Sequence, residues 1–557
     1  MLKNKTKKIL AKVLAISQRG RDFDFVIIAS LLFLSLSAFK GQPLVHDIEK
    51  EFAEIVVQEG KNDTTSREDS KKPFIVSSSE GKLYKKIFSK QDKGNWNEAD
   101  ELITELSNDV LLGDVLAERY LHDDYNSSKA ELDLWIKNYP DNYYAKRIAN
   151  LIKRKYPDRA GDLPKIKESR HLKGYGDANS TNVRFANKEI ARLWKNAINE
   201  WKNNKKSKSA VTFKKIANIT EKNKDKKNKK LSKWQYSAVN FWAYRSNIVA
   251  GNKQEADVFL RRAASNSRNF YGILANKKLG RKLDLNREPI YGVKVNVKDL
   301  LANPEVMRII ALAKSDLNER AEKQIRALFF NVSNEERWGL LSLAKYLKLP
   351  SAQIAMAKYM ERDNRKLDLL KYPIPKWQPE NGFNINPYLV YALMHQESGF
   401  RVSAESPAGA MGLMQLMPKT ASKMYYSNST STNGKKNFKD PIVNITLGER
   451  YIERLLETKI VDNNLIYMLA SYNAGIGNLK KWKEKTDYND DPLLFIENIP
   501  YWETRYYVMK VMTNYWIYSE LSEQNDSTIT ALLNNQWPKY LPSELYIAKS
   551  EQTANNG

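Results

Sequence analysis

Cysteine is absent from the 557-residue sequence and histidine is rare, and both facts exclude kinds of site. Without cysteine there is no disulfide framework, thiolate zinc site or cysteine nucleophile. The four histidines are scattered along the chain, at His46, His122, His171 and His395. A histidine-built metal centre and a Ser-His-Asp triad are therefore not expected. We predict neither a metal nor a cofactor.

Negative charge is also in short supply. The chain has 91 Lys and Arg residues against 65 Asp and Glu residues, a formal net charge of +26 at pH 7. Such a field favours polyanionic partners, which include nucleic acid, an anionic membrane surface and an acidic polymer. Basicity alone does not choose among these partners, and it also suits a surface that simply remains soluble.

An uncharged apolar run, FVIIASLLFLSLSAF, occupies residues 25–39 after a basic leader. As a helix it would span roughly 22 Å, which is short for a hydrocarbon core of about 30 Å. Small residues at Ser35 and Ser37 offer a cleavage site, so we interpret residues 1–41 as a secretory signal peptide. A retained N-terminal anchor is the alternative, because Asp22 and Asp24 lie beside the run. Both interpretations take the bulk of the protein out of the cytoplasm, where nucleic acid is no longer an expected partner.

The next two hundred residues show a helical pattern. Between residues 82 and 285 apolar and aromatic residues recur every three or four positions, and prolines such as Pro140 and Pro157 close short helical stretches. Short helices with short stops predict stacked helix pairs, an α-solenoid. Four tryptophans of this region stand at helical spacing and are predicted to be core residues rather than a carbohydrate-stacking surface: Trp194, Trp201, Trp234 and Trp242.

The pattern predicts an all-α fold in three parts after the N-terminal segment. Residues 42–296 are expected to form the α-superhelical solenoid, and a second helical block at 297–370 a small linker domain. Pro373, Pro375 and Pro379 then break the chain within seven residues. We therefore place a C-terminal domain at residues 371–557.

Glu397 is the most informative single residue of that C-terminal domain. A helix beginning near Asn386 and Pro387 would place Glu397 on the apolar face that carries Val390 and Leu393. A carboxyl group in an apolar setting has its charged form disfavoured, so its pKa rises and it can act as a general acid near neutral pH. The alternative is a structural carboxylate that is paired with an arginine.

Three further stretches provide polar side chains near glycine turns. They read SPAGAMGLMQLMPKTA at 406–421, SYNAGIGNLKKW at 471–482 and IPYWETRYYV at 499–508. One buried acid, several amides and hydroxyls, and many aromatic residues suit a cleft that binds a polysaccharide. The polar segment 427–437 between these stretches has no clear role and is interpreted as a surface insertion.

Together with HQESGF at 395–400, these stretches resemble the large, multidomain soluble lytic transglycosylases of bacterial cell walls, whose catalytic domain is lysozyme-like. The resemblance is concentrated between residues 380 and 520. FYGILANKKLG at 270–280 extends it weakly into the helical region.

The resemblance implies cleavage of the β-1,4 bond between N-acetylmuramic acid and N-acetylglucosamine, with formation of 1,6-anhydromuramic acid. Glu397 would be the single catalytic acid and then the base. Residues that align with substrate-binding or cleft positions are Ser406, Gln415, Met417, Tyr472, Asn473 and Glu503. For Glu503 a structural alternative is a brace to Arg505 or to another basic group.

The resemblance also implies a periplasmic location and peptidoglycan glycan strands as partners, whose stem-peptide carboxylates suit the basic chain. Cell-wall synthesis and division proteins, and peripheral contact with a membrane, stay open as further partners. Two rival functions also stay open. One is a hydrolytic muramidase in which Glu503 or Glu405 positions a water molecule, and the other is a catalytically silent wall-binding scaffold.

Overall fold

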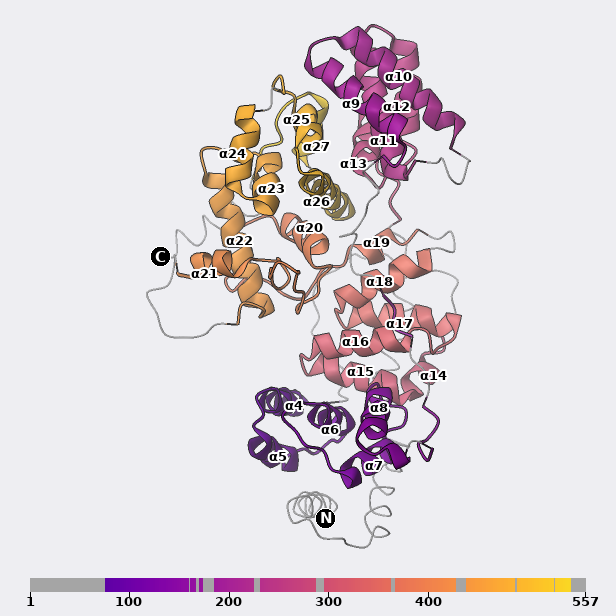
Figure 1. Ribbon diagram of the computed structural model, residues 1–557, viewed down its shortest axis with the longest axis vertical. Coiled ribbons are helices and arrows are strands. Elements are labelled where there is room, and N and C mark those ends of the chain that lie inside the picture. Colours follow the sequence, from indigo (N-terminus) through magenta and orange to yellow (C-terminus); the bar gives the residue numbers. More distant parts are fainter. Residues whose placement is uncertain are drawn as a thin grey trace. The chain divides into compact units, whose positions relative to one another are not determined.

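The structure is a computed structural model, and it is helical throughout the residues that it describes (Figure 1). These are residues 76–159, 161–166, 170–173, 185–224, 231–286, 295–361, 366–426, 437–485, 488–524 and 526–541. Within these ranges the only β-type pairing consists of isolated bridges. The predicted all-α fold class is thus confirmed. The apolar run at 25–39 and all but Asn437 of the segment 427–437 lie outside the described residues.

The chain divides into two compact units, one within Met1–Gly174 and Glu288–Asp363 and the other within Tyr175–Arg287 and Asn364–Gly557. Each unit therefore combines an early and a later segment of the chain. The domain boundaries proposed from the sequence remain a prediction. In the part of the chain that is described, no helix is both long enough and apolar enough to cross a membrane.

The first unit is built from short helices joined by tight turns. Its helices are α4 (Ser78–Gln91), α5 (Trp96–Thr104), α6 (Leu112–Tyr120), α7 (Lys129–Asn138), α8 (Ala145–Lys155), the 3₁₀ turn η2 (Pro157–Arg159), α14 (Val297–Ala302), α15 (Pro304–Lys314), α16 (Asn318–Leu328), α17 (Asn334–Tyr346) and α18 (Pro350–Met360). As predicted, α7 and α8 end just before a proline. The N-terminus of α7 is fixed by a capping box between Ser128 and Glu131, a feature that contributes on the order of 1 kcal/mol.

The second unit contains the candidate site. Its helices are α9 (Lys188–Lys202), α10 (Lys206–Lys222), α11 (Lys233–Val249), α12 (Lys253–Ala263), α13 (Phe270–Lys278), α19 (Asp368–Lys371), α20 (Pro387–Glu397), α21 (Pro418–Tyr426), α22 (Pro441–Glu457), α23 (Leu465–Ala474), α24 (Ile476–Lys485), α25 (Pro492–Asn498), α26 (Trp502–Leu521) and α27 (Ser527–Leu533). The four tryptophans predicted to be core residues are buried in α9 and α11.

Helix α26 is the central element of the second unit. It packs against α13, α20, α23 and α25, and Figure 1 shows α20 beside it. Its residues from Tyr506 to Met509 and from Val511 to Ser519 are buried, so nearly every face of the helix lies in the core. A helix that is buried on nearly all sides needs packing partners on all of them, and the surrounding helices supply them.

The FYG sequence at the start of α13 explains how this helix meets α26. The ring of Phe270 stacks on Trp516 with centroids 5.0 Å apart, and the Tyr271 hydroxyl donates a 2.5 Å hydrogen bond to the Glu497 carboxylate. Glycine is required at position 272, because a Cβ there would lie 1.8 Å from the Asn266 carbonyl oxygen. The motif is therefore a packing motif that joins two segments distant in the sequence.

Removal of the Tyr271 hydroxyl tests this junction. Tyr271 and Glu497 are 1% and 7% exposed, so Tyr271→Phe leaves a buried carboxylate without its hydrogen-bond donor. We expect the free energy of unfolding to fall by about 1–3 kcal/mol, measured by denaturant titration. The matched control is Tyr236→Phe, which removes a 2.6 Å bond to the half-buried Glu221 and should cost less than about 1 kcal/mol. Equal losses in the two variants would contradict a buried junction.

Candidate active site

Glu397 lies at the C-terminal end of α20, where the sequence predicted it. The helix begins at Pro387, with the Asn386 side chain accepting the Tyr388 backbone N–H at 3.0 Å. It ends at Glu397 because Ser398 is the C-cap and Gly399 follows with a φ of +56°. Leu389, Val390 and Leu393 are fully buried, so the face that carries Glu397 is packed into the core up to its last turn.

The carboxyl group of Glu397 is half-buried and faces α26. Its Oε1 accepts a 2.6 Å hydrogen bond from the Tyr507 hydroxyl. Burial raises the pKa of Glu397 to about 7; the bond from Tyr507 lowers it and the charge of nearby Glu503 raises it further. The group can therefore hold a proton near neutral pH, which is the requirement for a general acid.

Other carboxyl groups in this unit also have raised pKa values, but their partners show structural roles. Burial raises the pKa of Glu449 to about 7, and this group accepts the backbone N–H groups of Asn384 and Ile385 at 2.8 Å each. Glu497 accepts from Tyr271 and pairs with Arg505 at 3.5 Å. Within the described residues Glu397 has one hydrogen bond, from a tyrosine, and neither an arginine partner nor a backbone donor. The structure therefore does not support the alternative that Glu397 is a structural carboxylate paired with an arginine.

Aromatic hydroxyls surround the acid. Burial, followed by the charge of Glu397, raises the pKa of Tyr472 from α23 well above its usual value. Its hydroxyl donates a 2.8 Å bond to the Met414 carbonyl oxygen, and its ring lies 5.2 Å from that of Tyr451. Burial, followed by the charge of Glu397, likewise keeps the pKa of Tyr507 well above its usual value. Both hydroxyls therefore stay protonated and act as hydrogen-bond donors.

Glu503 lies in the first turn of α26 and is exposed. It acts on Glu397 through its charge. The alternative that Glu503 braces Arg505 is wrong, since the ion pair of that arginine is with Glu497. Tyr507 lies one helical turn after Glu503 and so shares its face of α26. The i, i+4 spacing of Glu503 and Tyr507 was the signal in the sequence that could have identified Tyr507.

The loop between α20 and α21 contains Ser406, Gln415 and Met417. The backbone φ of Gln415 is +46°, and its Nε2 donates to the carbonyl oxygens of Ala404 at 3.0 Å and Gly412 at 2.9 Å. The amide nitrogen is thus used by the loop, which leaves the amide oxygen as the group suited to a ligand. A left-handed conformation at a residue other than glycine costs roughly 1–2 kcal/mol, so the loop is held in a strained form.

Asn444 from α22 holds this loop in place and was not identified from the sequence. Its Oδ1 accepts the Met414 backbone N–H at 2.8 Å, and its Nδ2 donates to the Met411 carbonyl oxygen at 3.1 Å. A Cβ at Gly412 would lie 2.5 Å from that amide nitrogen, which explains the glycine. No local pattern marks this residue as a support of the loop, because the loop residues that it contacts, Met411 and Met414, are about 30 positions away.

The remaining predicted residues are Ser406, Met417 and Asn473, which lie at three different places in the unit. The Ser406 hydroxyl accepts the backbone N–H of Ala410 at 2.9 Å, within its own turn. Met417 is 44% exposed at the end of the loop. Asn473 accepts a 2.7 Å bond from the Thr504 hydroxyl, which ties α23 to the first turn of α26. The roles of these three residues in substrate binding remain predictions. In the part of the chain that is described, no cluster of three or more His, Asp and Glu residues could hold a metal ion.

Comparison with known proteins now adds to this geometry. The family described as transglycosylase SLT domain matches residues 377–495. The soluble lytic murein transglycosylase of Escherichia coli K12 is 28% identical over 291 residues, which cover 51% of this chain and 43% of that protein. The soluble lytic murein transglycosylase of Salmonella typhimurium is 27% identical over 320 residues, or 56% and 47% of the two chains.

The 70 kDa soluble lytic transglycosylase of Escherichia coli is a similar solved structure, with a TM-score of 0.47 and 18% identity over 94% of this chain and 79% of that one. The matched regions span less than half the length of the two curated relatives. Residues 377–495 are a transglycosylase SLT domain, which confirms the resemblance that the motifs predicted, and Glu397 lies within it.

The raised pKa of Glu397 also has a consequence for stability. A carboxyl whose folded pKa is about 7 and whose unfolded pKa is near 4.5 destabilises the fold progressively as pH rises through that interval. Glu397→Gln should therefore raise the free energy of unfolding by about 1–3 kcal/mol at pH 8 and change it little at pH 4. Denaturant titration at the two pH values measures the difference. A Glu397→Gln effect that is equal at both pH values would contradict the raised pKa.

Proposed function

We propose that this chain is a lytic transglycosylase of peptidoglycan. It cleaves the β-1,4 bond between N-acetylmuramic acid and N-acetylglucosamine and leaves 1,6-anhydromuramic acid ends. The observation that carries the proposal is the half-buried Glu397, which is protonatable near pH 7 and lies within a transglycosylase SLT domain. The names of the curated relatives support the same substrate.

The chemistry proceeds in two proton transfers by one carboxyl group. Protonated Glu397 gives its proton to the glycosidic oxygen while the bond from C1 to that oxygen breaks. The N-acetyl oxygen of the muramyl residue stabilises the developing positive charge at C1. The carboxylate then takes the proton of the muramyl C6 hydroxyl, whose oxygen bonds to C1. The enzyme returns to its protonated form and no water is consumed. An intramolecular hydroxyl can compete with water because its effective molarity is high.

The neighbours of Glu397 suit both halves of this cycle. Tyr507 donates to the carboxylate and so favours the ionised form, whereas the charge of Glu503 favours the protonated form. Burial is the main cause of the raised pKa, and the two neighbours act on it in opposite directions, so that near neutral pH one group can serve as acid and base. Glu405, a candidate for holding a hydrolytic water, is exposed and paired with Lys439 at 2.6 Å. This pairing favours transglycosylation over hydrolysis.

The product of the reaction tests the proposal directly. Muropeptides released from purified sacculi by the wild type should end in 1,6-anhydromuramic acid, identified by mass spectrometry. Glu397→Gln should release at least about 10³-fold less, because it removes the only group proposed to move protons. The variant keeps its shape, so it should still bind sacculi.

Two other outcomes would contradict the proposal in different ways. Products with reducing ends would make the protein a hydrolytic muramidase. No release by either protein, with binding retained, would favour a wall-binding scaffold.

The periplasmic location follows from the proposed substrate and from the apolar run at residues 25–39.

Two single substitutions should move the pH dependence in opposite directions. Glu503→Gln removes a negative charge that raises the pKa of Glu397, so the loss of kcat/KM at high pH should begin at lower pH. Tyr507→Phe removes a hydrogen bond that lowers this pKa, so the loss should begin at higher pH.

The two pH profiles are measured by the rate of muropeptide release between pH 5 and 9. Shifts of about half a unit or more are expected, each in its own direction. Shifts in the same direction, or unshifted profiles with lower rates, would contradict the assignment of the high-pH loss of activity to the ionisation of Glu397.

A further inference from the structure

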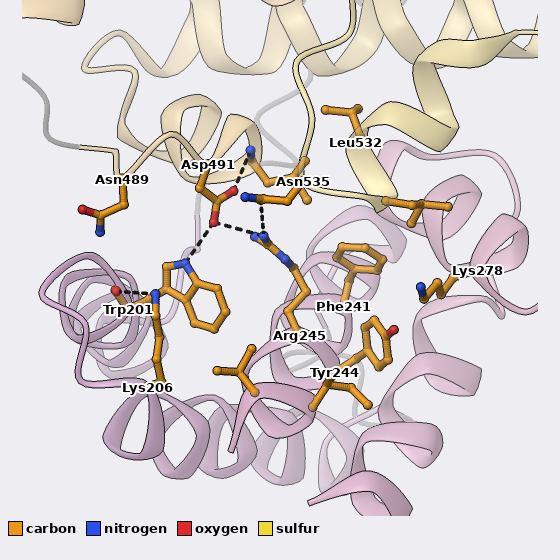
Figure 2. Close-up of a pocket in the computed structure, with 14 residues that line it drawn as sticks. Trp201, Lys206, Phe241, Tyr244, Arg245, Lys278, Asn489, Asp491, Leu532 and Asn535 are labelled. Atoms are coloured by element: carbon orange, nitrogen blue, oxygen red, sulfur yellow. Dashed lines mark hydrogen bonds and ion pairs between the residues drawn. The ribbon is translucent and has the colours of Figure 1, made fainter. Parts of the chain in front are cut away.

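A pocket away from the candidate active site lies in the second unit, lined by helices α9, α10, α11 and α13 together with the segments around α25 and α27. Its volume is about 360 Å³, which is in the range of small-molecule sites. None of the residues named above as part of the candidate active site lines it. Its lining comprises Trp201, Lys206, Phe241, Tyr244, Arg245, Ile248, Val249, Lys278, Asn489, Asp491, Leu493, Leu532, Leu533 and Asn535. The pocket is shown in Figure 2.

The charged groups of this pocket are unbalanced. Three cations line it, Lys206, Arg245 and Lys278, against one carboxylate, Asp491. The remaining lining residues are neutral, and most are apolar or aromatic. A surplus of positive charge in a partly desolvated, apolar-walled cavity attracts an anion more strongly than the same charge on an open surface.

Arg245 lies in the pocket between Asp491, Asn535 and two tryptophan rings. Its Nη2 donates to Asp491 at 3.0 Å and to Asn535 at 3.1 Å, as Figure 2 shows. The guanidinium lies over the rings of Trp201 at 5.1 Å and Trp242 at 4.8 Å. Its Nη1 is buried and makes no hydrogen bond within the described residues. One carboxylate therefore leaves part of this cation without a partner.

Lys206 is a second cation of the pocket, and unlike Arg245 it has no ion-pair partner within the described residues. Its Nζ donates to the Trp201 carbonyl oxygen at 2.9 Å and lies 3.7 Å from the centre of the Trp201 ring. Burial lowers its pKa, and Asp491 only partly opposes this effect. In the described part of the chain no carboxylate is within ion-pair distance of Lys206 or of Lys278.

The walls and the rim define the rest of a suitable ligand. Phe241 and Tyr244 are buried aromatic residues, and they provide apolar surface beside the cations. Ile248 and Val249 are 43% and 56% exposed at the end of α11.

We infer that this pocket binds a small organic anion in which a carboxylate adjoins an apolar group, and specifically the peptide part of a peptidoglycan fragment. The choice of peptide source rests on the proposed function, whereas the anionic chemistry does not.

The absence of cysteine allows the pocket to be labelled at one position. Val249→Cys, introduced into the full chain with Glu397→Gln, carries an environment-sensitive fluorophore at the rim. The probe ligand is N-acetylmuramyl-L-alanyl-D-isoglutamine, and its matched control is the same compound with the carboxylate amidated. We expect a saturable fluorescence change with the acid and affinity at least about tenfold weaker for the amide, as loss of one charge-assisted contact implies. No saturable change, or equal affinity for acid and amide, would overturn the proposal.

Two pairs of variants distinguish binding in this pocket from binding elsewhere on the protein. A label at Val258→Cys, which is 47% exposed on α12 and outside the pocket, should not respond. Lys278→Glu at the pocket should weaken binding at least about tenfold, whereas Lys282→Glu outside it should not. A response of the control label, or equal effects of the two lysine variants, would place the ligand elsewhere and overturn the proposal.

Failure of this proposal and failure of the proposed function give different results. The labelled protein carries Glu397→Gln and cannot turn over, so its fluorescence reports binding alone. Release of muropeptides from sacculi by the wild type is measured separately. A protein that cleaves sacculi but shows no carboxylate-dependent signal at position 249 would refute only the pocket.

Discussion

The packing of α20 against α26 is the constraint on which the candidate site depends. Helix α26 is buried on nearly every face, so its position is set by its packing against the surrounding helices. It places Tyr507 2.6 Å from Glu397 at the end of α20. The carboxyl group loses part of its hydration there and gains one tyrosine donor in exchange. This imbalance keeps a proton on the group near pH 7.

The helical array of α9–α13 contributes to the same arrangement. Tyr271 binds Glu497, which pairs with Arg505 near the start of α26, and Phe270 stacks on Trp516 further along that helix. The segment before the candidate domain therefore belongs to the structural support of the candidate site. This accounts for the FYG sequence, whose resemblance to the family was weak and whose role could not be interpreted from the sequence.

The second unit contains several buried or half-buried carboxyl groups, and the hydrogen-bond and ion-pair partners of each group distinguish a structural role from a candidate catalytic one. Glu449 holds backbone N–H groups before α20, and Glu497 pairs with an arginine and a tyrosine. Asp491 accepts two backbone N–H groups at the start of α25 and also binds Arg245 and Trp201. Glu397 has the fewest partners of these. A carboxyl group that is already fully bonded stabilises the fold, whereas one that retains bonding capacity can exchange a proton with a ligand.

Local features of the candidate site could be predicted because they depend on residues close in sequence. The start of α20 at Pro387, its end after Glu397 and the glycine turn at Gly475 follow from capping, helical spacing and backbone freedom. The four motifs also identified the SLT domain, since their combination is specific. What the sequence by itself determined was therefore the helical fold class, the candidate for the acid and the family of its domain.

Only the tertiary structure decided the surroundings of that acid. Tyr507 is 110 positions from Glu397, and Arg245 is 246 positions from Asp491. The tertiary structure also showed that Arg505 pairs with Glu497 rather than Glu503, and that Asn444 holds the loop that contains Gln415. The physical reason is that pKa values and ion pairs depend on distance and burial in space. Residues far apart in the chain set both, and no local periodicity records which of them will meet.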